Sequence, residues 1–324
     1  MDTVSLGRSG LRVSRLCLGT MLFGSQCDES SAARIMDEAA ELGIDFLDLA
    51  DVYPVPPGPA TWGRTEEIVG RWLAGKRERF VVATKCVSRV GPGPNDVGGS
   101  RKHVIEACER SLRRLRTDRV DLFYLHHSDL AAPMEESLEA LDRLVRDGKA
   151  LYIGVSNFEA WQLGVALAVI AERRLARLAA VQPRYNLLHR PYERDLLPLA
   201  RAAGLGVAPY SPLAAGMLTG TYRRGQTPPE GSRFARGDYG RISQARYWSD
   251  RAFDVSEAVT EIAAVERMTP AQVALAWLLG QDGVTSPIIG ASRPEQLRDS
   301  VGVVGRQISD ESLRRLDEIS RVFV

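Results

Sequence analysis

Four side chains that could act together on a carbonyl group follow three successive apolar segments of the chain. Asp48 and Tyr53 follow the first segment, Lys85 ends the second, and His126 ends the third. A free phenol has a pKa of about 10, but a neighbouring ammonium stabilises the phenolate and makes the phenol a usable general acid. A carboxylate would hold that ammonium in place, and an imidazole would orient the oxygen that receives the proton. This set of groups predicts protonation of an oxygen while hydride reaches the carbonyl carbon.

Taken singly, each of these residues is more often a solvated loop residue or an aromatic at the rim of a site. Their occurrence after successive apolar segments favours a shared role, because the carboxyl ends of barrel strands meet at one face. Acyl transfer is not indicated, since no serine has the G-x-S-x-G setting of a nucleophile elbow.

The elements that must position these residues alternate between short apolar segments and helix-like segments. Short apolar segments of this kind are typical of buried parallel strands, and the stretches between them predict crossover helices. One helix is expected to begin at Ser30 or Ser31, and another to run from Val255 to Leu279. The pattern predicts an α/β fold, a (β/α)8 TIM barrel, as a single domain over residues 1–324.

The barrel is expected to start with an N-terminal β-hairpin, formed by residues 3–6 and 10–13. A doubly wound open sheet is the alternative fold. It is disfavoured because no G-x-G-x-x-G fingerprint follows the first strand. Gly91-Pro92-Gly93 lacks the third glycine and opens no periodic helix.

The chain resembles the aldo-keto reductase family over nearly its whole length. The resemblance lies in an ordered set of stretches: Leu18-Gly19-Thr20, Phe46 to Tyr53, Ala83-Thr84-Lys85, Asp121 to Asp129, Gly154 to Phe158, Tyr210 to Leu213, and Ile289 to Arg293. It implies a (β/α)8 barrel that binds NADPH and reduces an aldehyde or ketone to an alcohol. Asp48, Tyr53, Lys85 and His126 would form the catalytic tetrad, with Tyr53 as the proton donor. His127 would pack or line the pocket rim, because neighbouring strand residues point to opposite faces.

The resemblance also implies a cofactor cradle, made mainly by the second half of the chain. Ser156, Asn157 and Gln182 would hold the nicotinamide carboxamide, and Tyr210 would stack on the ring. Arg293 would grip the 2′-phosphate, since a guanidinium pairs bidentately with phosphate. The full set of expected cofactor-binding residues is Gly19, Thr20, Met21, Ser156, Asn157, Gln182, Tyr210, Ser211, Pro212, Leu213, Gly216, Leu218, Gly220, Arg233, Gly290, Ser292, Arg293 and Gln296.

Several of these positions have a second interpretation. Gln182 by itself would be a buried glutamine satisfied by the backbone, and Arg293 a solvated residue at a helix start. Thr221 stands where many relatives carry a lysine, and Ser300 where the family often has an asparagine. A cation in place of that lysine would come from Arg223, Arg224 or Arg233.

Composition argues against several other kinds of protein. Lys and Arg total 42 against 41 Asp and Glu, so the chain has no basic footprint for nucleic acid or an anionic membrane. The basic cluster Arg110, Arg113, Arg114 and Arg116 is interpreted as the solvated face of a helix. No apolar segment approaches the roughly 18 to 20 residues of a membrane span. The four cysteines lack C-x-x-C spacing, so reduced thiols and a cytoplasmic location are expected, and the four histidines indicate no metal site.

The expected partner is a small-molecule carbonyl substrate, and the sequence leaves the oligomeric state open. One alternative is a nucleotide-linked keto-sugar reductase of deoxysugar biosynthesis, whose branch resembles this chain at residues 63–73. Another is a cofactor-binding regulatory protein similar to the β subunits of voltage-gated potassium channels.

Met21, Phe23 and Trp62 are expected in the pocket wall, and the long loop 216–241 is expected to become ordered when ligand binds.

Overall fold

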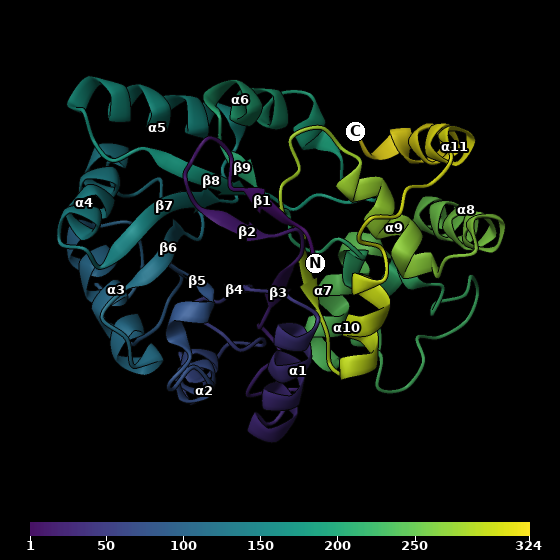
Figure 1. The fold of residues 1–324 in the computed structure, drawn as a ribbon, viewed down its shortest axis with the longest axis horizontal. Helices are drawn as coiled ribbons and strands as arrows, with labels where there is room; N and C mark the ends of the chain where they lie inside the picture. Colours follow the sequence, from purple (N-terminus) through teal and green to yellow (C-terminus); the bar gives the residue numbers. More distant parts are fainter.

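Eight parallel strands curl around a common centre in the computed structural model, which describes residues 1–324 (Figure 1). The strand order is β10-β3-β4-β5-β6-β7-β8-β9, so the last strand of the chain returns beside the first strand of the sheet. The strands are β3 Cys17–Gly19, β4 Phe46–Asp48, β5 Val81–Cys86, β6 Val120–Leu125, β7 Ala150–Ser156, β8 Leu178–Gln182, β9 Gly206–Val207 and β10 Ile288–Gly290.

The two outer strands of this sheet are joined by hydrogen bonds through the chain that leads into β10. Val207 pairs in parallel with Val284, and the amide of Thr285 donates to the carbonyl of Val207 at 2.8 Å. Further along, the amide of Ile288 donates to the carbonyl of Pro209 at 2.8 Å. The sheet therefore closes and has no free edge, which confirms the predicted barrel and rules out the open doubly wound sheet.

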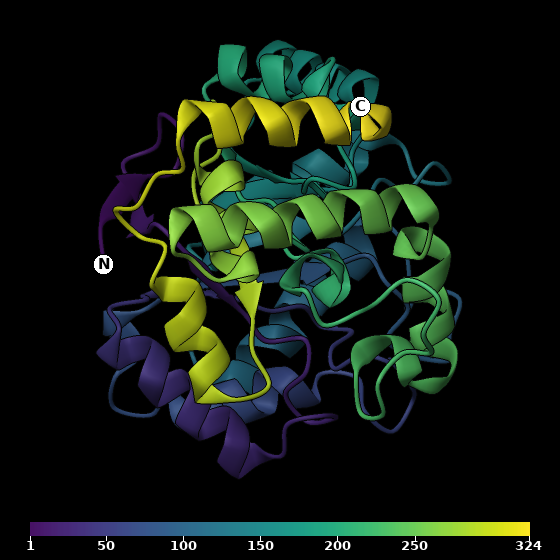
Figure 2. The same ribbon diagram turned by 90° about the vertical axis from the view of Figure 1, so that its right-hand side faces the viewer.

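Helices surround the strands on the outside of the barrel (Figure 1). Figure 2 shows α8 and α11 side by side across one outer face. The helices are α1 Glu29–Glu41, α2 Arg64–Trp72, α3 Arg101–Leu115, α4 Met134–Arg146, α5 Ala160–Arg173, α6 Leu196–Ala203, α7 Gly237–Tyr247, α8 Asp250–Glu266, α9 Pro270–Leu279, α10 Pro294–Val301 and α11 Asp310–Ser320. None of these helices has the length and apolar character needed to span a bilayer.

Two predicted helix boundaries are wrong. Helix α1 begins earlier than expected, because Asp28 rather than Ser30 or Ser31 is its N-cap and accepts from the Ser31 amide at 2.8 Å. The segment predicted as one helix from Val255 to Leu279 is two helices, α8 and α9. Arg267 takes a left-handed conformation, and Thr269 and Pro270 then start a new helix with a capping box.

The N-terminal hairpin closes one end of the barrel. Its strands β1 Thr3–Ser5 and β2 Arg12–Ser14 pair antiparallel, as predicted. Leu6, in the turn between them, is fully buried and packs with barrel-interior residues that include Phe46, Leu122 and Tyr124. Since this end is filled with apolar side chains, the chemistry is confined to the opposite end, where the strands finish.

The long excursion between β9 and α8, residues 208–249, contains more regular structure than the sequence indicated. It holds the short 3-10 helices η3 Ala214–Thr219 and η4 Arg233–Ala235, followed by helix α7. Helix α7 was missed because Gly237 and Gly240 and its mostly polar residues give no amphipathic period. Trp248 then packs against an aromatic cluster of Tyr222, Phe234 and Phe253, with ring centroids 5.8, 5.5 and 5.0 Å away.

Candidate active site

Asp48 and Lys85 form a buried ion pair at the carboxyl ends of neighbouring strands. Asp48 ends β4, and Lys85 lies near the end of the adjacent strand β5. The Lys85 ammonium donates to Asp48 Oδ2 at 2.6 Å and to the Leu49 carbonyl at 2.6 Å. Lys85 is 0% and Asp48 3% exposed. A buried charge of this kind is stable only while its partner remains, so the pair fixes both side chains in place.

Tyr53 and His126 lie next to this pair. The ring centroid of Tyr53 is 5.2 Å from Lys85 Nζ. The His126 ring meets the Tyr53 ring edge to face, with centroids 6.0 Å apart at 80°. His126 directly follows β6, where its amide donates to the Cys86 carbonyl at 3.0 Å. The structure therefore places the four residues proposed as the tetrad around one point.

The phenol of Tyr53 is a weaker acid in this setting than in water. Burial raises the pKa of Tyr53 well above its usual value, and the negative charge of Asp48 raises it further. The sequence-based expectation was the opposite, that the ammonium would lower the pKa of Tyr53. Lys85 is already paired with Asp48 at 2.6 Å, so its charge is largely compensated. Tyr53 consequently remains protonated at neutral pH, which a proton donor requires.

His126 is neutral in this environment. Burial lowers the pKa of His126 well below its usual value, and the charges of Lys85 and His127 lower it further. Ser88 Oγ lies 3.5 Å from its Nδ1. A neutral imidazole carries one N–H that can donate to a carbonyl oxygen. His127 is exposed and its Nδ1 lies 3.2 Å from the Ser128 carbonyl oxygen, in keeping with a rim position.

Gln182 connects the cofactor-cradle residues to this site. Its Nε2 donates to Asp48 Oδ1 at 2.8 Å, so the carboxylate is held by both Gln182 and Lys85. Ser156 Oγ donates to the Gln182 carbonyl at 2.8 Å. The alternative of a glutamine satisfied only by backbone is therefore wrong for the Gln182 side chain, whose partner is a carboxylate.

Asn157 and Tyr210 continue the same network. Asn157 Nδ2 donates to the His126 carbonyl at 2.9 Å, and the Tyr210 hydroxyl donates to Asn157 Oδ1 at 2.7 Å. Asn157 itself has a left-handed conformation with φ 54°. Four of the predicted cradle residues, Ser156, Asn157, Gln182 and Tyr210, thus lie within one hydrogen-bonded chain that reaches Asp48 and His126.

The predicted residues after β3 border the same place. Gly19 ends β3, and Thr20 Oγ1 donates to the Asp48 carbonyl at 2.9 Å. Met21 is partly buried and packs on the core. Phe23 was expected in the pocket wall, but its side chain is 0% exposed inside the core. It therefore offers a substrate no surface.

The segment after β9 could offer a cofactor backbone groups more than side chains. Ser211, Gly216 and Gly220 have positive φ values of 57°, 97° and 72°, and the Gly216 amide donates to the Leu213 carbonyl at 2.8 Å within the turn. The Leu218 side chain is fully buried, so only its backbone could approach a cofactor. Pro212 is buried and Leu213 packs against the core.

The candidate cations in this region differ in whether a carboxylate already pairs with them. Arg224 is bound to three carboxylates, with its nearest contact 2.5 Å from Asp254 Oδ1, so it cannot replace the lysine missing at Thr221. The guanidinium of Arg233 lies 5.4 Å from the ring centroid of Tyr239, its α7 neighbour. No carboxylate pairs with Arg233, which leaves it able to bind an anion.

The segment after β10 leads directly into helix α10. Arg293 is the N-cap of α10 and has no acidic partner, whereas the Ser292 amide and hydroxyl both donate to Gln296 Oε1, at 2.8 and 3.1 Å. Gly290 ends β10 and is exposed. Ser300 is buried in α10 at 4% exposure. The unpaired guanidinium of Arg293 is thus the free charge in this turn.

The sequence analysis assigned no role to two further residues, Tyr239 and Asp51. Tyr239 of α7 is among the groups that raise the pKa of Tyr53. Asp51 is 1% exposed, and neither of its side-chain oxygens has a hydrogen-bond partner. Burial and the nearby Glu66 raise the pKa of Asp51 well above its usual value. Asp51 is therefore a buried acid that is held toward its protonated form.

Comparison with known proteins agrees with this geometry. A family model described as the aldo/keto reductase family matches residues 15–321. The chain belongs to the aldo/keto reductase family. It is accordingly an oxidoreductase of a family that acts on carbonyl groups.

Three relatives cover nearly the whole chain. The uncharacterized oxidoreductase YrpG of Bacillus subtilis is 42% identical over 98% of this chain and 96% of its own. A probable voltage-gated potassium channel subunit beta of Arabidopsis thaliana is 37% identical over 94% of this chain and 91% of its own. L-glyceraldehyde 3-phosphate reductase of Escherichia coli K12 is 37% identical over 96% of this chain and 90% of its own.

Proposed function

We propose that this aldo/keto reductase uses NADPH to reduce aldehydes or ketones to alcohols, with Tyr53 as the proton donor. The observation that carries the proposal is the meeting of a protonated phenol, a neutral imidazole and a buried Lys85–Asp48 pair at one end of the barrel. Groups arranged in this way can deliver a proton to an oxygen and stabilise the charge that is left behind.

The residues of the chain are suited to a nicotinamide cofactor. Amide and hydroxyl groups of Ser156, Asn157 and Gln182 adjoin the tetrad, and the Tyr210 ring is fixed beside them by its bond to Asn157. Arg293, the N-cap of α10, offers an unpaired guanidinium to which a 2′-phosphate would bind. When bound, NADPH supplies the hydride.

The protein's own part in the reaction is to position the oxygen and to move one proton. Tyr53 Oη donates its proton to the carbonyl oxygen as that oxygen gains negative charge. The Lys85 ammonium then lies close enough to stabilise the phenolate, and Asp48 holds Lys85 there. The neutral His126 ring donates a hydrogen bond that orients the same oxygen.

The test of this proposal is the substitution Tyr53→Phe. Loss of a general acid lowers turnover by about 10²- to 10⁴-fold, whereas NADPH affinity is expected to stay within about two-fold because the hydroxyl does not bind the cofactor. Tyr152→Phe is the matched control, since Tyr152 is partly buried at the opposite end of the barrel, early in β7. Turnover is measured by loss of NADPH absorbance with a panel of aryl aldehydes and ketones. Near-normal turnover of Tyr53→Phe would falsify the proton-donor assignment.

A second function is favoured by the relatives named as potassium channel β subunits. In this case the protein would bind the cofactor and regulate a membrane protein, and turnover would be secondary. Stoichiometric co-purification with a membrane protein, retained in Tyr53→Phe, would support this function. Robust turnover in the absence of any such partner would favour the enzyme.

We also propose a cytoplasmic location. All four cysteines are unpaired and buried, and their reduced thiols are typical of a reducing compartment. Fractionation of the source cells with an antibody against the chain checks this, and recovery in an oxidising compartment would contradict it.

A further inference from the structure

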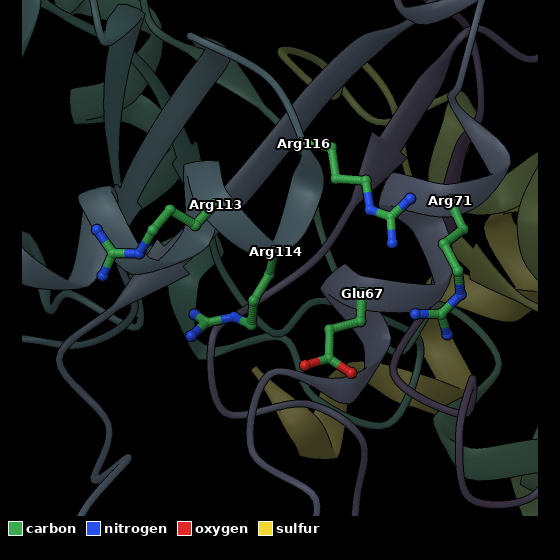
Figure 3. A pocket seen from close by; sticks show the side chains of 5 residues that line it. All are labelled: Glu67, Arg71, Arg113, Arg114 and Arg116. Carbon is green, nitrogen blue, oxygen red and sulfur yellow. The ribbon is translucent and has the colours of Figure 1, made fainter.

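A cavity lies on the outside of the barrel, between helices α2 and α3. It has a volume of about 370 Å³ and is lined by Glu67, Arg71, Arg113, Arg114 and Arg116, with no apolar residue among them (Figure 3). Two of these residues belong to α2, two to α3, and Arg116 is the C-cap of α3. None of them belongs to the proposed tetrad or cofactor cradle.

The charges that line this cavity are not balanced. Four arginines and one glutamate line it, and the Arg113 side chain points away from Glu67, Arg71 and Arg116 (Figure 3). Arg71 binds Glu29 through two contacts of 2.6 and 2.9 Å, and Arg114 binds Glu66 at 2.7 Å. Arg113 and Arg116 have no carboxylate oxygen within 4.0 Å and make no side-chain hydrogen bond. Two guanidiniums therefore remain able to bind an anion.

Arg114 is fixed in position by buried groups. Its partner Glu66 is 0% exposed and also accepts from Thr84 Oγ1 at 2.5 Å. A Cβ added to Gly63 would lie 2.4 Å from Arg114 Nε, so glycine at this position leaves room for the side chain. A guanidinium that is already fixed loses little entropy when it binds a ligand.

The sequence-based interpretation of these arginines as a solvated helix face does not account for this arrangement. Arg113 and Arg114 lie in the last turn of α3, where positive charge interacts favourably with the helix dipole. That interaction explains charge along α3 alone. Arg71, of a different helix, lines the same cavity and is held there by its ion pair with Glu29 (Figure 3).

We propose that the α2–α3 cavity binds a compact polyanion of the phosphate class, either inorganic pyrophosphate or the phosphate tail of a nucleotide. Guanidiniums pair bidentately with phosphate oxygens, and several of them match a ligand with more than one negative charge. The absence of apolar lining disfavours a ligand with a large apolar body.

The experiment is titration calorimetry with pyrophosphate at low ionic strength. The test variant is Arg113→Gln/Arg116→Gln, which removes the two unpaired charges. Its matched control is Arg251→Gln/Arg314→Gln, which removes two exposed and equally unpaired arginines on α8 and α11. Arg114 is not substituted, because its loss would leave the Glu66 charge buried and uncompensated.

Wild-type protein and the control are expected to bind pyrophosphate with similar affinity, and the test variant about ten-fold or more weakly. Glu67→Gln removes the only carboxylate from the lining and is expected to bind pyrophosphate more tightly than wild type. This gain of affinity can be measured even if the double variant does not fold. No saturable binding to wild type, or equal loss in test and control, would overturn the proposal.

Two further arms identify the ligand and the place where it binds. Pyrophosphate could also enter the proposed cofactor cradle, so Arg293→Gln is titrated in parallel and is expected to bind like wild type. Loss of binding in Arg293→Gln alone would assign the pyrophosphate to the cradle and overturn the proposal. ADP binding more tightly than pyrophosphate, with the same dependence on Arg113 and Arg116, identifies a nucleotide tail. The reverse order identifies the inorganic anion.

Discussion

At the scale of single residues, the chemistry depends on the surroundings of a side chain more than on its type. Tyr53 and Tyr210 are both phenols beside the same network, and burial raises the pKa of each. The pKa of Tyr210 rises to about 12, and its hydroxyl donates to Asn157. Tyr53 instead lies beside Asp48 and Lys85 with no bonded partner for its hydroxyl. Under the proposed function, its proton is the one that a substrate would receive.

Arg293 is expected to determine the choice between NADPH and NADH. Its guanidinium has no acidic partner, so a 2′-phosphate would be its only strong ligand. Arg293→Ala should weaken NADPH binding by about ten- to a hundred-fold, the equivalent of roughly 1.5 to 3 kcal/mol for a charge-assisted contact. NADH binding should change little. Titration of both cofactors checks this, and equal weakening of both would show that Arg293 does not contact the 2′-phosphate.

Asp51 is expected to make the protein's stability depend on pH. Burial holds the pKa of Asp51 in the folded protein well above its value in the unfolded chain. At pH values between these two pKa values, the folded protein keeps a proton that the unfolded chain releases. The stabilisation is complete below about pH 4 and is lost as the pH rises toward the folded pKa. In Asp51→Asn this loss is absent. The unfolding free energy of the variant relative to wild type should therefore increase by up to about 1.4 kcal/mol per pH unit above about pH 4.

Urea unfolding of both proteins at several pH values measures this difference. Glu67→Gln, at an exposed carboxylate on α2, serves as the control and should run parallel to wild type. Parallel curves for Asp51→Asn and wild type would mean that Asp51 is ionised in the folded state.

At the scale of elements, an aromatic cluster holds the long excursion after β9 on the barrel. Tyr222 and Phe234 stack with centroids 4.3 Å apart, and Trp248 contacts both of them and Phe253 of α8. These contacts cross from the excursion to the body of the barrel. They hold α7, which lies between Phe234 and Trp248 along the chain, on the barrel.

Trp248→Ala should loosen this excursion while leaving the barrel folded. Limited proteolysis is expected to cut the variant faster than wild type between residues 216 and 248, because local opening governs cleavage of such segments. Saturating NADPH should slow cleavage of wild type, as the excursion borders the proposed cofactor cradle. Trp161→Ala is the control, since Trp161 lies exposed on α5. Equal cleavage of all three proteins, with and without NADPH, would exclude a lid-like role.

At the scale of the whole molecule, one arginine joins the first and last parts of the chain. It lies at the seam of the barrel, where β3 pairs with β10. Arg15 donates to the carbonyls of Val284 and Thr285 at 2.7 Å each, and to that of Leu279 at 2.8 Å. It lies just before β3, which pairs with β10. Closure of the barrel therefore depends on a contact between residues more than 260 positions apart.

Arg15→Ala should lower the free energy of unfolding by about 2 to 4 kcal/mol, because three carbonyls lose a charged donor. Arg12→Ala removes only exposed bonds to Thr3 and should cost less than about 1 kcal/mol. Denaturant midpoints compare the two variants with wild type. A similar, small effect of both substitutions would show that the Arg15 contacts do not stabilise the seam.

Local patterns in the sequence were sufficient for the barrel and for gathering the candidate site residues at one end of it. Buried parallel strands appear as short apolar runs, and the residues after them necessarily collect at one end of a closed sheet. Asp48, Lys85 and His126 could therefore be assigned to one site from their positions alone. Helix boundaries were less predictable, because the break between α8 and α9 depends on a single left-handed residue, Arg267, inside an otherwise helical pattern.

Only the tertiary structure decided how these groups affect one another. The raised pKa of Tyr53 follows from burial and from the pairing of Lys85 with Asp48 across two strands. The Gln182–Asp48 bond and the approach of α7 depend on the packing of distant segments. The same holds for the arginine cavity between α2 and α3. Burial and electrostatic coupling act through space, and their strength depends on distances and solvent exclusion that the order of residues along the chain does not contain.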